Sequence, residues 1–151
     1  MKTRTDARTL ALMARVARVR EIQAKQALAQ AIERKGAQQA RTHEARMRVE
    51  RSGTALQGAL SGPAIDLVRL PLLQELSMHV QAMLASEYEH LAEGGWQVAE
   101  QAGVAGKRAR QRERLDEETA TTVERLRRAH EARQLESATE AWLVRRHAEA
   151  P

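Results

Sequence analysis

Residues 61–71 read SGPAIDLVRLP, and this stretch decides the fold because it holds two of the three prolines in the chain. Pro63 breaks a helix that precedes it, since proline lacks the amide hydrogen that a helix interior needs. Pro71 suits the first turn of a following helix, where that hydrogen has no partner anyway. No proline lies between Asp6 and Leu60. The sequence therefore predicts two helices joined by an apolar turn over residues 61–71.

The predicted first helix covers residues 6–60, with Asp6 as its candidate N-cap and Thr5 as the near alternative. A seam of mostly small apolar residues recurs through it at three- and four-residue spacing, which is typical of a coiled coil. The seam consists of Leu10, Ala14, Ala17, Ala24, Leu28, Ala31, Ala45, Val49, Leu56 and Ala59, and it is interrupted by Glu21, Lys35, Gln38 and Thr42. Because alanine dominates the seam, we expect this helix to depend on a partner helix.

The predicted second helix covers residues 72–147 and carries a better apolar stripe. The stripe consists of Leu73, Leu76, Val80, Met83 or Leu84, and Leu91, and its phase continues through Val98, Ala105, Leu126, Ala129 and Leu143. Gly94 and Gly95 interrupt it, at about 1 kcal/mol each relative to alanine. We expect one long helix with a weak point there, with two helices joined by a bend as the alternative.

These features predict an all-α fold, an elongated two-helix antiparallel coiled-coil hairpin that forms a single module over residues 1–151. The first helix would be on the order of 80 Å long and the second on the order of 110 Å. The second helix would therefore overhang by roughly 30 Å. The overhang contains Trp142, an aromatic residue of the kind enriched among interface anchors. We expect this end to bind another protein.

Composition excludes several classes of function. The chain has no Cys, which excludes disulfides, thiolate zinc sites and cysteine nucleophiles. No apolar run reaches the roughly 20 residues that span a bilayer, and the first 30 residues lack the apolar core of a secretory signal. We therefore expect a cytoplasmic protein without a membrane span.

The sequence offers no catalytic or cofactor motif, so we expect no enzyme activity, cofactor, metal or small-molecule substrate. Glu87 and His90 form half of a di-iron motif, but a second copy is missing and a surface pair is the favoured interpretation. The basic run at residues 107–114 could bind phosphates. We favour a solvated helix face over nucleic-acid binding, because no aromatic side chains alternate with the cations and acidic residues follow at once.

Two stretches of the chain stand out, LMARVARVREIQAKQALAQA at residues 12–31 and VERLRRAHEAR at residues 123–133. They resemble the FliJ family, the flagellar export stalk proteins related to the YscO-type stalk proteins of injectisomes. The segment Leu135-Glu136-Ser137-Ala138 stands where that family often has an acidic Leu-Asp-Glu step. The resemblance implies a type III export protein of bacterial flagellum biogenesis and motility, or of an injectisome, that is peripherally associated with the inner-membrane export apparatus.

The resemblance also implies partners: the hexameric export ATPase, the cytoplasmic domain of the export gate, and export chaperones. The ATPase-ring contact would then use Arg125, Arg127, Arg128, Arg133, Trp142, Arg145 and Arg146. The gate or chaperone contact would use Ile65, Leu67, Leu70, Leu73, Leu76, Val80, Leu84 and Tyr88. Two other functions remain open on the same fold: a generic coiled-coil scaffold or chaperone-like adaptor, and a basic coiled coil that associates with nucleic acid.

Overall fold

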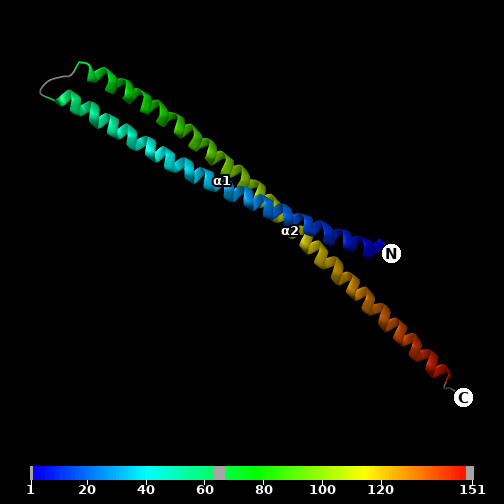
Figure 1. Cartoon of the computed structure of the whole chain (residues 1–151). Helices are drawn as coiled ribbons and strands as arrows, with labels where there is room; N and C mark the ends of the chain where they lie inside the picture. The colour runs from blue at the N-terminus through cyan, green and yellow to red at the C-terminus, as the bar shows by residue number, and fades with distance from the viewer. Residues whose placement is uncertain (1, 63–66, 149–151) are drawn as a thin grey trace. The chain divides into compact units, whose positions relative to one another are not determined.

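The computed structural model describes residues 2–62 and 67–148, and the side chains of residues 6–62 and 67–147. These residues form two α-helices, α1 (Lys2–Ser61) and α2 (Arg69–Ala148), and contain no strand (Figure 1). The two helices pack against each other. The predicted all-α two-helix hairpin is therefore confirmed, and so is the greater length of the second helix, at 80 residues against 60.

Both helices begin earlier in the sequence than predicted. α1 extends to Lys2, before the proposed cap Asp6, and α2 starts at Arg69, before Pro71. Pro71 is then the third residue of α2, still within the first turn, where backbone amides have no intrahelical acceptor. The predicted turn is consequently shorter: Gly62, Leu67 and Val68 lie outside the helices, and residues 63–66 lie outside the described part of the chain.

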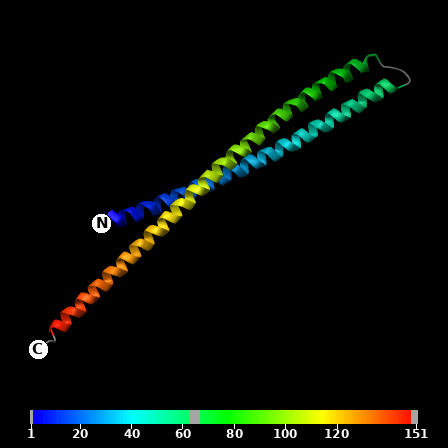
Figure 2. The same cartoon turned by 180° about the vertical axis from the view of Figure 1, so that it is seen from behind.

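The hairpin divides into two compact units. Unit 1 consists of Met1–Gln23 and Gly106–Pro151, and unit 2 of Ala24–Ala105. Within unit 2, Figure 1 and Figure 2 show the segments of α1 and α2 running side by side. The Thr42 hydroxyl reaches across, with its Oγ1 3.4 Å from the backbone carbonyl oxygen of Glu87. In unit 1, Arg18 and Glu21 of α1 form ion pairs with residues of α2.

The seam of α1 is made largely of alanine, as the sequence predicted. Its buried apolar residues are Ala14, Ala17, Ala24, Ala31 and Ala45, and Glu21, Thr42 and Ser52 are buried at the same spacing. Small side chains let helices approach closely but remove little apolar area from water. No large side chain among the described residues is fully buried. The hairpin therefore has a narrow seam instead of a thick core.

The predicted stripe of α2 was partly wrong. Leu73, Val80, Leu84 and Leu91 turn toward α1, but Leu76 and Met83 are exposed and the buried residue between Leu73 and Val80 is Ser77. A strict alternation of three- and four-residue steps requires position 77, whereas sequence reasoning selected the larger neighbouring side chain. Farther along, Leu126 is half-buried, while Ala129 and Leu143 are exposed. The seam thus ends near Leu126.

Gly94 and Gly95 lie inside α2, which continues through them without a break. Gly94 is buried, and a Cβ added there would overlap the side-chain amide oxygen of Gln38 on α1. A Cβ added at Gly95 would meet nothing within 4 Å. The two glycines therefore differ: Gly94 makes room for a side chain of the other helix, and Gly95 does not.

Candidate interaction surfaces

The most exposed part of α2 is its last portion, residues 127–147, which we call the α2 tip. Every described side chain of this segment is exposed to solvent. At 1.5 Å per residue the segment is about 32 Å long. Such a length of uncovered helix resembles a binding element more than part of a core. The residues predicted for an ATPase contact all lie in it, except Arg125, which is exposed just before it.

Part of the charge in and near the tip is used within α2 itself. Arg127 pairs with Glu124 at 3.5 Å and with Glu131 at 3.4 Å, and Arg128 pairs with Glu124 at 2.9 Å. These one-turn pairs are typical of a solvated helix face. In contrast, no acidic side chain of the described residues pairs with Arg125, Arg133 or Arg145. Together with Arg146, whose contact is with the Trp142 ring, these arginines remain for an anionic partner.

Trp142 is the largest side chain of the tip and is 55% exposed. The guanidinium carbon of Arg146, one turn further on, lies 5.1 Å from the centroid of the Trp142 ring. This cation–π contact holds the ring against its own helix. Leu135, two turns earlier on the same face, is 69% exposed. The tip therefore presents an exposed aromatic side chain next to a cation.

The residues predicted for a gate or chaperone contact do not form one surface. Leu70, Leu73 and Leu84 are half-buried in the seam and Val80 is buried there, so they pack against α1. Leu67, Leu76 and Tyr88 are exposed, and Ile65 lies outside the described residues.

A second apolar face of α2 lies one residue out of phase with its seam. It consists of Leu72, Leu76 and Met83, all exposed, and we call it the turn-end stripe. Sequence reasoning included Leu76 but assigned it to the seam. The sequence contained a signal for this face, because steps of four and seven residues place these three side chains on one side of a helix. The turn-end stripe is thus a better candidate surface than the predicted set.

Unit 1 contains an ion-pair cluster that sequence reasoning missed. Glu21, with a side chain only 9% exposed, accepts a hydrogen bond from Arg112 at 3.0 Å. Arg112 also donates to Asp116 at 3.2 Å, and Asp116 accepts from Arg18 at 3.0 Å. The hydrogen bond from Arg18, together with that from Arg112, lowers the pKa of Asp116 below its usual value. The cluster links the two helices and fixes their pairing in unit 1.

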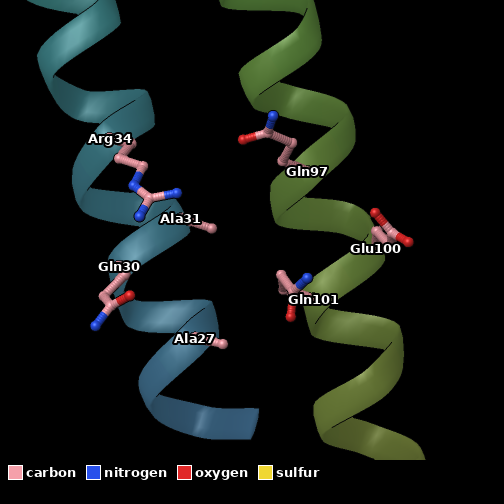
Figure 3. Close-up of a pocket in the computed structure, with 7 residues that line it drawn as sticks. All are labelled: Ala27, Gln30, Ala31, Arg34, Gln97, Glu100 and Gln101. Carbon is pink, nitrogen blue, oxygen red and sulfur yellow. The ribbon is translucent and has the colours of Figure 1, made fainter.

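Glu87 and His90, singled out from the sequence as half of a di-iron motif, belong to no metal-binding cluster of the described residues. No three His, Asp or Glu side chains among them gather closely enough to bind a metal ion. Glu87 turns toward the seam, whereas His90 is exposed. A shallow groove in unit 2 is lined by Ala27, Gln30, Ala31 and Arg34 of α1 and by Gln97, Glu100 and Gln101 of α2. Figure 3 shows Ala27 and Ala31 pointing toward α2, so this groove is the space that short seam side chains leave.

Comparisons with protein-family models, with curated proteins and with solved structures give no match for this chain. Neither helix, over its described residues, contains an apolar stretch long enough to cross a membrane. The exposed surfaces of the hairpin are therefore the features that indicate its function.

Proposed function

We propose that this hairpin is an adaptor that acts through protein–protein contacts and catalyses no reaction. The observation that carries the proposal is the α2 tip, in which about 32 Å of helix is exposed and bears Trp142 beside Arg146. Aromatic residues and arginine are the side chains most enriched among residues that dominate binding energy. A partner that covers the tip would bury both.

In its specific form, the proposal is that the adaptor is the stalk of a type III protein export ATPase, flagellar or injectisome. Three features support it: the hairpin topology, the longer second helix, and the resemblance to the FliJ family over residues 12–31 and 123–133. The α2 tip would enter the ATPase ring, with Arg125, Arg133 and Arg145 facing acidic groups. The turn-end stripe would be presented to the export gate or to export chaperones at the membrane.

The test is the rate of ATP hydrolysis by the purified cognate export ATPase with and without this protein. The expected result is a higher rate and more hexamer when the protein is present. Trp142→Ala should raise the concentration needed for half of the effect by about tenfold or more. The matched control is Trp96→Ala, which removes the other tryptophan, 80% exposed and in unit 2, and should change nothing.

An unchanged rate of ATP hydrolysis at saturating protein would contradict the stalk proposal. The adaptor proposal would then rest on the scaffold alternative, which the exposed leucines of the turn-end stripe favour. That alternative expects self-association or capture of a client through Leu72 and Leu76. Sedimentation velocity tests for this self-association: the wild-type chain should form larger species, and a Leu72→Ser, Leu76→Ser variant should not.

A further inference from the structure

The first part of α1 is apolar on two opposite sides. Ala14 and Ala17 are buried against α2, whereas Leu12, Val16 and Val19 are 59%, 50% and 53% exposed. We call these three residues the outer stripe. At about 100° per residue, they lie within a sector roughly 60° wide, on the side of α1 away from the seam. Apart from Leu10, which is half-buried, the larger apolar side chains of this segment face solvent and the smaller ones face α2.

The outer stripe is bordered by two grooves of unit 1. One is lined by Leu12, Arg15, Val16, Val19, Arg20 and Gln23. The other runs from the stripe to α2 and is lined by Thr9, Leu12, Met13, Val16, Ala17, Arg20, Gln111 and Leu115. A helix that is apolar on both sides is usually covered on both. A contiguous apolar surface with a groove beside it marks a binding site for another molecule.

The charges around the stripe indicate the kind of molecule. Glu21 is the only acidic residue between positions 7 and 32, and it is turned into the seam, where it pairs with Arg112. Arg15 and Arg20 lie on either side of the stripe and line its grooves. An occupant must therefore bring negative charge at the edges of an apolar stripe.

From this arrangement we propose that the outer stripe docks an acidic amphipathic helix of a partner protein. Such a helix would lie along about 22 Å of α1, from Thr9 to Gln23, and would complete a three-helix bundle. A second copy of this chain fits poorly, because it would set Arg15 and Arg20 against the same arginines. A lipid surface fits poorly as well, because the stripe has no aromatic side chain to insert. The site is separate from the α2 tip, so it goes beyond the proposed adaptor function.

The test uses the full-length chain and a fluorescent helical peptide of about three heptads, with Leu at the a and d positions and Glu at e and g. The expected result is saturable binding, measured by anisotropy, that weakens as salt concentration rises. Val16→Glu should weaken binding by about tenfold or more. Ile32→Glu is the matched control: it makes the same charge change on the same helix at a β-branched residue of similar exposure, 54%, and should leave binding unchanged.

The peptide is also tested with Lys in place of Glu, and it should then bind at least about tenfold more weakly. An Arg15→Glu, Arg20→Glu variant should reverse that preference, and it tests the proposal even if Val16→Glu fails to fold. Equal binding of both peptides, or binding that survives Val16→Glu in a folded protein, overturns the proposal. Tighter binding to phosphatidylserine vesicles than to the acidic peptide would also overturn the proposal, because it would assign the stripe to a lipid surface. Self-association that Val16→Glu abolishes would overturn it as well, because it would assign the stripe to a second copy of the chain.

Discussion

Replacing each of two neighbouring glycines by alanine tests the packing of unit 2 directly. Gly94 and Gly95 occupy the same helix and differ by one position, yet only Gly94 lies under a side chain of α1. We expect Gly95→Ala to increase the free energy of unfolding, because alanine restricts the unfolded chain and its Cβ enters open space. We expect Gly94→Ala to give little or none of this increase, because its Cβ would overlap the amide of Gln38.

The magnitudes follow from the two environments. Glycine in a helix interior costs about 1 kcal/mol relative to alanine, so Gly95→Ala should gain about 1 kcal/mol. At Gly94 the obstructing atoms are the far end of a flexible side chain, which can move aside. A displaced rotamer costs about 0.5–1.5 kcal/mol, which offsets the gain. The net change for Gly94→Ala should therefore be close to zero.

A double-mutant cycle assigns the difference to Gln38. Gln38→Ala removes the obstructing amide, whose buried Oε1 has no hydrogen-bond partner among the described residues. In that background Gly94→Ala and Gly95→Ala should both gain about 1 kcal/mol. The assay is urea unfolding followed by far-ultraviolet circular dichroism. Equal gains at both glycines in the wild-type background, or a difference that persists without Gln38, would refute this packing argument.

Three further predictions concern the seam, the ion pairs and the tip. Val80→Ala should lower the free energy of unfolding by about 1–2 kcal/mol, because Val80 is buried. Leu76→Ala, at an exposed site of the same helix, should lower it by less than about 0.5 kcal/mol. Urea unfolding of the two variants measures the difference. Hydrogen bonds from Arg18 and Arg112 lower the pKa of Asp116 below its ordinary value of 3.8. The stability that the Asp116 carboxylate contributes should therefore be complete above pH 3.8 and decline as the pH falls through the lower pKa of the folded state. Asp116→Asn should remove that part of the acid dependence of the thermal midpoint. Trp142→Ala should leave the thermal midpoint unchanged, because the ring contributes to no seam, and a clear decrease would mean that the tip is packed in solution.

The alanine seam of α1 could be predicted from the sequence, but the exact seam positions of α2 could not. The alanines of α1 recur so regularly that their burial followed from spacing alone. In α2 the seam position between Leu73 and Val80 is Ser77, next to the larger Leu76. Hydrophobicity favours Leu76, and only the geometry of packing against α1 favours Ser77. Where spacing and side-chain size disagreed, spacing decided the structure.

The contacts between distant residues were beyond the sequence pattern. Glu21 was noted as an interruption of the seam, and Arg112 as part of a basic run, but their pairing depends on how α1 and α2 align. The residue pattern within one helix does not determine its register against the other helix. The tip residues were easier to place, because any part of α2 beyond the seam had to be exposed. The candidate surfaces were therefore predictable where they depend on helix length and were missed where they depend on register.

The outer stripe has a consequence for the stability of the hairpin itself. Burial of apolar area contributes about 25 cal/mol per Å², so the alanines of the seam yield little compared with leucine and valine. In the first part of α1 the larger residues, Leu12, Val16 and Val19, remain about half exposed. A helix docked on them would add a second apolar interface to unit 1, with larger side chains than Ala14 and Ala17 bring to the seam. Because a ligand that binds only the folded state stabilises it, the acidic peptide should raise the thermal midpoint of the chain, and Val16→Glu should abolish that increase.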